Sequence, residues 1–544
     1  MFKKNEFTEL EITDVTAEGN GVGRADGIII FVPNTAVGDR IRAKIVKVTK
    51  NYCYGIVDEL LEKSPDRVQP DCEVYKTCGG CCFRHISYEA ETALKEKIVR
   101  DAIERIGKVT TAEFEPILPC YPCEAYRNKA QYPVAELNGK IVCGFYSKRS
   151  HRVVPFTKCR LQPKEFGHIT DTITEFLTER KISAYSEITH KGLVRHIYLR
   201  KGFHSGEVMV CLVVTKDISA ELKGLVHLLI EKFPYITNIS LNINSSATNV
   251  ILGKRVITLY GKDTITDIMC GNKIELSPLS FYQVNTLQAE KLYGIAKEYA
   301  ELKGNETLLD LYCGAGTIGL SMAGSVKKLV GVEIVPEAVE NAKHNAELNN
   351  IENAEFFCGD AGEIASKLNE KPDVIIIDPP RKGCDMATLD TIINISPEKV
   401  VMISCNPSTA GRDCNYFQQN GYKVRKVRAV DLFPRTSHVE TCVLLGRKIV
   451  NDKNVEYMHV DYEPEDAEYL RGIKGSATYA EIKKWIKEQY NVSVSSLYIA
   501  QCKDECGFEK RENFNTGAEG HRVPNCPEEK KKLILEAFKH FKMI

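Results

Sequence analysis

The sequence predicts a multidomain α/β protein in four parts: an N-terminal β-barrel of OB type, a β-rich central domain, a doubly wound parallel sheet and a small helix-rich tail. Three observations support this prediction. Short apolar segments with glycine turns fill residues 6 to about 60, cysteines gather at residues 72–82, and strands alternate with helices from Thr307 onward. We place the domain boundaries at residues 1–65, 66–275, 276–448 and 449–544.

The composition fits a soluble protein with several cores. The chain has 544 residues, of which 43% are hydrophobic. Lys+Arg and Asp+Glu both number 73, so any contact with nucleic acid must come from local patches and not from overall charge. No apolar run is long enough to cross a bilayer and the N-terminus lacks a signal-like segment, so we expect a cytoplasmic protein with no membrane partner.

The first part is expected to be all-β. Residues 9–15 alternate between polar and apolar, residues 28–32 are apolar, and residues 41–48 follow a turn at Gly38. Five short strands with glycine turns suit a small barrel of OB type, a fold that commonly binds nucleic acid. A purely structural β-domain is the alternative, since the segment is slightly acidic.

The central part begins with a cysteine cluster. The chain has 20 cysteines, and in a reducing compartment metal binding or catalysis must explain some of them. Cys72, Cys78 and Cys81 are closely spaced with glycines between the last two, and Cys159 follows much later. Such a set can form a four-thiolate shell around a compact inorganic core, with zinc as the alternative metal. Cys82 is an alternative ligand because it directly follows Cys81.

The remainder of the central part contains a predicted helix at residues 88–106 and a β-rich stretch at residues 120–275. Cys120 and Cys123 have metal-like spacing but no second pair, so we interpret them as structural. No acidic residue occurs between residues 137 and 164, where basic and aromatic residues are interleaved. Such a patch can hold phosphates and stack unpaired bases, with a solvated surface as the alternative. Its members are Lys140, Phe145, Tyr146, Lys148, Arg149, Arg152, Phe156, Lys158, Arg160 and Lys164.

The third part shows helical periodicity at residues 286–302 and then five apolar strands. The expected strands are residues 308–311, 329–332, 374–377, 400–403 and 423–430, and the sheet is expected to end near residues 441–446. Ligands of such sheets bind at the carboxyl ends of the strands. Two of these strand ends carry Asp378 and Cys405.

A glycine-rich turn at residues 310–319 follows the first of these strands and opens a helix. Gly314 and Gly316 let the backbone turn tightly and approach a ligand. The next strand ends at Glu333, about 23 residues after Asp310, where a carboxylate usually holds ribose hydroxyls. A solvated charge is the alternative for Glu333. The turn therefore predicts a nucleotide-type cofactor.

A dinucleotide oxidoreductase is the first competing class, because Gly314, Gly316 and Gly319 fit the Gly-x-Gly-x-x-Gly spacing. The motif lies, however, behind a cysteine-rich region, and the following strand ends carry a Pro-Pro pair and a cysteine. The turn with Asp310 resembles more closely motif I of S-adenosylmethionine-dependent methyltransferases.

Five motifs in order resemble one family, the RNA (uracil-5-)-methyltransferases, and within it the 23S rRNA branch. They are residues 280–285, 310–319, 378–381, 404–407 and 431–440, and the resemblance spans residues 6–446. It implies a TRAM-type RNA-binding barrel, a central iron–sulfur and RNA-binding domain and a Rossmann-like methyltransferase domain. One position departs from the pattern: Arg435 stands where many members have histidine, and we expect no effect on the chemistry.

The resemblance also implies residue roles. S-adenosylmethionine or its surroundings would be contacted by Gln283, Tyr312, Glu333 and Asp378. Cys405 would be the nucleophile and Glu440 the general base. A 4Fe–4S cluster would be held by Cys72, Cys78, Cys81 and Cys159. The implied partner is 23S rRNA, with the T-loop of tRNA as the alternative substrate, and we expect a monomer.

The chemistry explains why a cysteine and a carboxylate are needed. Uracil C5 is too weak a nucleophile to take a methyl group directly, but a thiolate adding at C6 converts the ring to an enolate whose C5 can attack. A base must then remove the C5 proton so that the thiolate can leave. We expect nearby positive charge to lower the pKa of Cys405. The alternatives are a buried structural thiol at Cys405 and a non-catalytic RNA-binding iron–sulfur protein.

The tail, residues 449–544, exceeds the usual family length. Helices are expected at residues 479–489 and 527–542, with a further helix beginning near residues 494–499, which would suit a small winged-helix-like module. Cys502, Cys506 and Cys526 have only His521 as a candidate fourth ligand, so we expect no zinc site. The sequence assigns this module no role.

Overall fold

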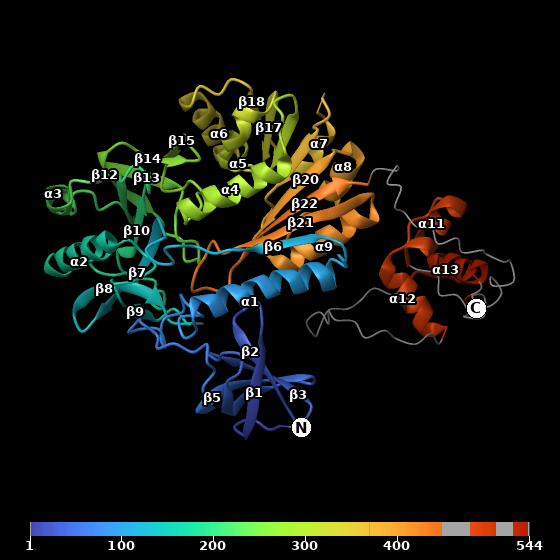
Figure 1. Cartoon of the computed structure of the whole chain (residues 1–544), viewed down its shortest axis with the longest axis horizontal. Helices are drawn as coiled ribbons and strands as arrows, with labels where there is room; N and C mark the ends of the chain where they lie inside the picture. The colour runs from blue at the N-terminus through green and yellow to red at the C-terminus, as the bar shows by residue number, and fades with distance from the viewer. Residues whose placement is uncertain are drawn as a thin grey trace. The chain divides into compact units, whose positions relative to one another are not determined.

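A computed structural model describes residues 2–148, 150–368, 370–448, 479–506, 526–541 and 543. The chain forms two compact units, Met1–Val450 and Asn451–Ile544 (Figure 1). Among the described helices, none has the length and apolar character needed to cross a membrane.

The N-terminal strands close into the predicted barrel. Their order is β1-β2-β3-β5-β4, so the sheet has no free edge. Alternate residues point inward, and Ile12, Ile30 and Ile41 are fully buried. The strands are β1 Phe7–Val15, β2 Asn20–Ala25, β3 Ile28–Pro33, β4 Arg40–Val48 and β5 Tyr52–Glu62.

The central segment forms a seven-stranded sheet with the order β13-β12-β11-β10-β7-β8-β9. Its strands are β7 Lys129–Leu137, β8 Lys140–Tyr146, β9 Val153–Pro155, β10 Val194–Lys201, β11 Val208–Val214, β12 Ile236–Ile243 and β13 Arg255–Gly261. Two helices not foreseen from sequence, α2 Lys164–Glu179 and α3 Lys223–Lys232, cover it. Helix α2 is rich in Thr and Ile, which favour strands, but its buried Phe166, Ile169 and Ile173 recur at helical spacing.

A hairpin of β14 Ile265–Met269 and β15 Asn272–Leu276 leads into the third part, an eight-stranded sheet with the order β18-β17-β16-β19-β20-β22-β21-β6. All the predicted strands are present, but the predicted parallel sheet is parallel only in part. Strand β22 lies antiparallel between β20 and β21, because the short connection after β21 allows only an antiparallel neighbour. The strands are β16 Thr307–Leu311, β17 Lys328–Glu333, β18 Ala354–Cys358, β19 Val374–Ile377, β20 Lys399–Ser404, β21 Tyr422–Val430, β22 Glu440–Arg447 and β6 Glu113–Leu118.

Helices cover both faces of this sheet, as expected for a doubly wound fold. Neighbouring residues of β16 show this directly, since Leu308 lies in one core with Leu292 and Leu309 lies in the other with Leu389. The helices are α4 Thr286–Ala300, α5 Thr317–Met322, α6 Pro336–Leu348, α7 Ala361–Ser366, α8 Met386–Ile395 and α9 Pro407–Gln419, with a 3₁₀ turn at Ala323–Ser325.

An element from the segment before residue 120 completes the sheet. Helix α1, Tyr88–Asp101, is capped by Ser87 and continues as a π-helical turn, Ala102–Ile106. Strand β6 then pairs with β21 (Figure 1), and the π-helical turn packs on α9. Residues 88–118, which the predicted boundaries place in the central domain, therefore belong physically to the third part.

The second unit contains three described helices: α11 Tyr479–Tyr490, α12 Ser496–Glu505 and α13 Glu528–His540. They pack around a core that includes Ile486, Ile499 and Phe538, which confirms the predicted helices. His521 lies outside the described residues. The described part of this unit has no strand, so the wing of the predicted module is not seen in it.

Candidate active site

The glycine-rich turn joins β16 to α5 and is fixed by Glu333. Gly314 and Gly316 have φ values of +55° and +81°, which glycine adopts readily. The Glu333 carboxylate accepts the amide N–H of Gly314 at 3.1 Å and that of Val335 at 2.9 Å. The predicted ribose-binding carboxylate therefore lies directly against the turn.

Asp310 lies buried beneath this turn. One of its oxygens, Oδ2, accepts the amide N–H of Gly319 at 2.8 Å, whereas the buried Oδ1 has no hydrogen-bond partner. Burial, together with the charges of Asp378 and Glu333, raises the pKa of Asp310 to about 7. A group of carboxylates with an unpaired buried oxygen suits a ligand that brings hydroxyl donors and a positive charge.

Tyr312 belongs to this turn, whereas Gln283 contacts Asn128 beside the central sheet. Tyr312 is half-buried, and its hydroxyl lies 3.4 Å from Thr388 Oγ1. Gln283 precedes α4, and its backbone carbonyl accepts a 2.8 Å hydrogen bond from Asn128 Nδ2. Helix α4 packs on the turn, since Tyr293 Oη lies 3.4 Å from Thr317 Oγ1.

Arg381 joins three of the predicted motifs. Its carbonyl accepts a hydrogen bond from Asn406 Nδ2 at 3.0 Å, which ties residues 378–381 to residues 404–407. Its Nη2 lies 3.3 Å from His438 Nε2, which ties it to residues 431–440. Arg381 and His438 lie within two of the motifs, but the sequence predicts no role for either, because their partners come from other loops.

Cys405 and Glu440 lie across from each other at the end of two paired strands. The antiparallel register pairs Ile403 with Cys442 and Ser404 with Thr441, so the next step places Cys405 opposite Glu440. Glu440 is 4% exposed and Cys405 is half-buried. The insertion of β22 beside β20 therefore brings the two predicted catalytic side chains together.

The electrostatics of this pair differ from the expectation. Burial, then Glu440 and Asp378, raises the pKa of Cys405 to about 11, and Arg381 opposes the rise only in part. The predicted lowering of the thiol pKa is therefore wrong for the protein without ligands, because the neighbouring charges are mostly carboxylates. Burial and the charge of Asp378 raise the pKa of Glu440 to about 8, and burial raises that of Asp378 to about 7.

The four predicted metal-binding cysteines line one cavity. It has a volume of about 140 Å³, and its walls include Cys72, Cys78, Cys81 and Cys159 together with Arg84, Phe145 and Phe156. Cys82 does not line it and packs instead near Gly19 and Phe83. Cys120 and Cys123 also lie outside it, and Cys120 Sγ accepts a hydrogen bond from Asn285 Nδ2 at 3.3 Å.

Two kinds of metal site can be built from four cysteine thiols, and they differ in how closely the sulfurs are grouped. Within the described part of the chain, no three or more Cys, His, Asp or Glu side chains are grouped closely enough to hold a metal ion. A tetrahedral zinc site needs all sulfurs at about 2.3 Å from one ion. In a cubane cluster each thiolate binds a different iron, so the four sulfurs stand farther apart. Four cysteines around one cavity form a donor set that either kind of site could use, and metal binding stays a prediction.

A second hollow lies beside the cysteine cavity, in the predicted basic and aromatic patch. It has a volume of about 520 Å³ and is lined by Gly80, Phe145, Tyr146, Lys148 and His151, among others. The patch has fewer unpaired basic side chains than expected, because Arg160 forms ion pairs with Glu124 and Asp71. Arg149 lies outside the described residues.

Comparisons with known proteins agree with this geometry. The family described as tRNA (uracil-5-)-methyltransferase matches residues 121–448, and the TRAM domain family matches residues 3–57. The chain belongs to the tRNA (uracil-5-)-methyltransferase family. It is thus a member of the S-adenosylmethionine-dependent RNA uracil-5-methyltransferases with an RNA-binding TRAM barrel, and the oxidoreductase alternative is wrong.

Relatives and a solved structure support this membership. RNA methyltransferases named as uncharacterized from Halalkalibacterium halodurans and Clostridium acetobutylicum are each 42% identical, over 82% of this chain and 98% of their own length. The Pyrococcus abyssi tRNA (uracil-54, C5)-methyltransferase, solved with S-adenosyl-L-homocysteine, is 25% identical with a TM-score of 0.64, covering 80% of this chain and 100% of that one.

Proposed function

We propose that this protein methylates C5 of a uridine in 23S rRNA, with S-adenosylmethionine as methyl donor and a covalent bond between Cys405 and uracil C6. The observation that carries the proposal is the register that sets Cys405 opposite Glu440 at the strand ends. Asp378 and Arg381, on the loop after β19, are close enough for their charges to act on both Cys405 and Glu440.

The methyl donor would bind at the carboxyl end of β16. Glu333 would take the ribose hydroxyls, and the unpaired Oδ1 of Asp310 marks a further acceptor in this region. Tyr312, Gln283 and Asp378 would surround the remainder of the molecule. When bound, the donor supplies the methyl group and a positive sulfonium charge, which would lower the pKa values of nearby acidic groups.

The two catalytic side chains would act in sequence. The Cys405 thiol would release its proton to solvent and its sulfur would bond to C6; the displaced ring electrons would let C5 take the methyl group, leaving S-adenosylhomocysteine. Glu440 then takes the C5 proton, the ring electrons return, and the C6–S bond breaks to release 5-methyluridine and free Cys405. A carboxyl group whose pKa is about 8 is suited to accept a proton near neutral pH.

We also propose that Cys72, Cys78, Cys81 and Cys159 hold one 4Fe–4S cluster. Methyl transfer consumes no electrons, so the cluster would shape the protein and its RNA-binding surface. Anaerobically purified protein should be brown with about four irons per chain. Cys81→Ser should lose the iron and its matched control Cys82→Ser should keep it, because only Cys81 lines the cavity. Stoichiometric zinc in place of iron would refute the cluster.

The target uridine must leave its stack to reach Cys405, so a loop or bulge is the expected substrate. The TRAM barrel together with the cysteine cluster resembles the rRNA branch. The tRNA T-loop is the second candidate, because the Pyrococcus abyssi structural neighbour is a tRNA (uracil-54, C5)-methyltransferase.

Incubation with labelled methyl donor and unmodified 23S rRNA or tRNA tests both the reaction and the substrate. Label in 5-methyluridine of rRNA is the expected result. No label in either RNA would refute the enzyme activity, and label only in tRNA would leave the chemistry and overturn the rRNA assignment. Mapping of 5-methyluridine in cells with and without the gene gives the same distinction in vivo.

A further inference from the structure

Arg435 connects two segments that the proposed function treats separately. We define the motif loop as residues 431–439, which join β21 to Glu440, and the cysteine loop as residues 72–83. The carbonyl oxygen of Arg435 accepts the backbone N–H groups of Cys82 at 2.9 Å and Phe83 at 3.3 Å. Cys82 directly follows Cys81, so the amide that binds the Arg435 carbonyl belongs to the residue next to a predicted metal ligand.

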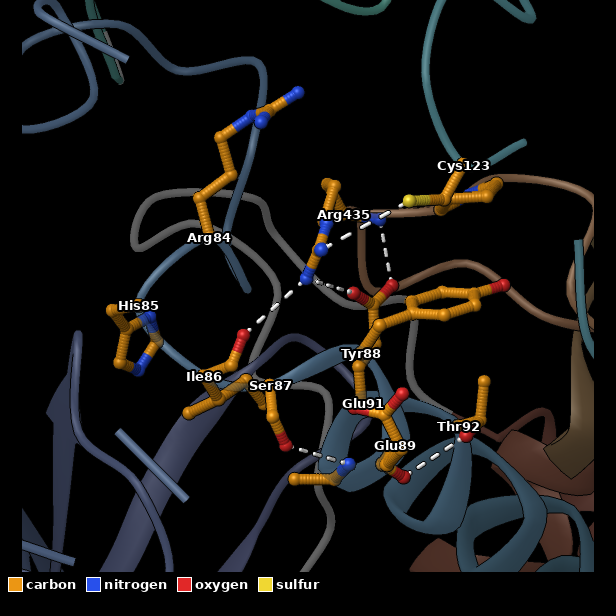
Figure 2. A network of polar contacts seen from close by, with 12 residues as sticks. Arg84, His85, Ile86, Ser87, Tyr88, Glu89, Glu91, Thr92, Cys123 and Arg435 are labelled. Carbon is orange, nitrogen blue, oxygen red and sulfur yellow. Dashed lines mark hydrogen bonds and ion pairs between the residues drawn. The ribbon is translucent and has the colours of Figure 1, made fainter. Parts of the chain in front are cut away.

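The side chain and amide of Arg435 are anchored on α1 (Figure 2). The amide N–H donates to Glu91 Oε1 at 2.6 Å, and Nη1 donates to the Ile86 carbonyl at 3.3 Å and lies 3.4 Å from Glu91 Oε2. The guanidinium also lies over the Tyr88 ring, 5.3 Å from its centroid. The backbone amide, the carbonyl and the side chain of Arg435 therefore all have partners.

This residue also has an uncommon backbone conformation. Arg435 has a φ of +68°, in the left-handed region that favours glycine. A residue with a side chain persists there when its surroundings fix it from several directions, and such positions cluster at functional sites. Its contacts with the cysteine loop and α1 provide that fixation.

A buried charged network holds the motif loop on the same helix. Lys95 Nζ donates to Glu91 and to Asp431, both at 2.7 Å, and to the Phe433 carbonyl at 3.1 Å. Lys95, Glu91 and Asp431 have no exposed side-chain surface. Because such groups tolerate little displacement without losing their partners, the loop has one favoured position.

The other end of the motif loop reaches the reacting groups. His438 lies 3.3 Å from Arg381, and Glu440 begins β22 directly after the loop. Only four residues separate Arg435 from Glu440. A shift at Arg435 is thus passed along a short segment to the general base, whereas Cys405 is held by β20.

We propose that Arg435 is a positioning residue through which the cysteine loop sets the position of Glu440, given the roles of Glu440 and the cysteines in the proposed function. Ordering of the four cysteines fixes the Cys82 and Phe83 amides, these hold the Arg435 carbonyl, and Arg435 aligns the motif loop. The effect falls on the second half of the reaction, because Cys405 does not depend on this loop.

Hydrogen exchange of the wild-type protein tests the coupling without any variant. Iron-loaded and chelator-treated protein are compared by mass spectrometry. Removal of the metal should speed exchange in residues 72–83 and also in residues 431–440, while the glycine-rich turn at residues 310–319 should not change. Faster exchange confined to residues 72–83 would overturn the proposal.

Kinetics of Arg435 variants test the consequence for catalysis. In Arg435→Ala, the rate of covalent adduct formation should stay within about twofold, while adduct resolution should slow by about 10²-fold, as expected for a displaced catalytic group. Arg435→Gly should behave alike, since glycine also lacks the guanidinium even though it adopts the positive φ without strain, and Arg435→Lys should recover part of the rate. Arg447→Ala, which removes a contact to Ser396 at the far end of β22, is the matched control and should be unaffected.

Two results would overturn the positioning role of Arg435. Equal slowing of adduct formation and resolution would indicate general damage, and wild-type kinetics in Arg435→Gly would assign the effect to backbone strain. A wild-type protein that forms no adduct would refute the proposed function, whereas the exchange experiment would still report on the coupling.

Discussion

Two regions of this protein use cysteine in opposite ways. Cys405 lies at the end of a strand, where the register with β22 fixes its position and carboxylates surround it. The four predicted cluster cysteines lie on loops around a cavity, beside Arg84 and aromatic side chains. The predicted nucleophile is thus positioned by the sheet, whereas the predicted metal ligands lie on loops that a bound metal would order. Arg435 lies where the two regions meet.

The largest effect is expected at the strand end. Cys405→Ala should reduce methyl transfer to background and abolish the band shift with 5-fluorouridine RNA, because alanine has no thiol to add to C6. Cys358→Ala, which removes an exposed thiol from β18 of the same sheet, should leave both unchanged. Retained turnover in Cys405→Ala would show that Cys405 is not the nucleophile.

Glu440→Gln should separate the two halves of the reaction. The amide cannot take the C5 proton, so a covalent RNA adduct should accumulate and its resolution should slow by about 10²–10⁴-fold. Denaturing gel electrophoresis with ordinary RNA measures the adduct, and wild-type protein with 5-fluorouridine RNA provides the reference band. The absence of an adduct would count against Cys405 as well as Glu440.

The buried network of Lys95, Glu91 and Asp431 should contribute strongly to the free energy of unfolding. Lys95→Met leaves Glu91 and Asp431 without their cation, and the free energy of unfolding should fall by about 3–5 kcal/mol. Lys97→Met is the matched control on the same helix, since Lys97 is exposed and paired with Asp14, and its cost should be about 0–1 kcal/mol. Urea unfolding measures both, and equal costs would show that the network does not hold the motif loop.

The smallest expected effect is a pH dependence at Glu440, whose pKa burial raises from 4.5 to about 8. The carboxylate is the active base, so adduct resolution should speed up by about tenfold per pH unit and level off above pH ~8. Stability runs the other way: the folded state favours the neutral carboxyl, so this contribution is complete below pH 4.5 and is lost as the pH rises through about 8. Glu440→Gln should remove that part of the stability curve, and a resolution rate independent of pH would argue against Glu440 as the base.

Much of the fold and the candidate site follows from local patterns. Apolar runs predict the strands of the third part and, with glycines between them, the strands of the barrel, because each run is a property of contiguous residues. The glycine-rich turn, Glu333 and Cys405 could be predicted in the same way, since each lies at the end of a predicted strand. The alternation of strands and helices was sufficient to predict a doubly wound sheet.

Other features depend on contacts between distant segments. The antiparallel insertion of β22, which sets Cys405 opposite Glu440, and the addition of β6 are matters of strand pairing that no single segment encodes. Burial among carboxylates made the pKa of Cys405 rise where a fall was expected. The role of Arg435 likewise depends on partners more than 300 positions away in the chain, such as Glu91. Register, burial and electrostatics are long-range quantities, so they are settled only when the chain has folded.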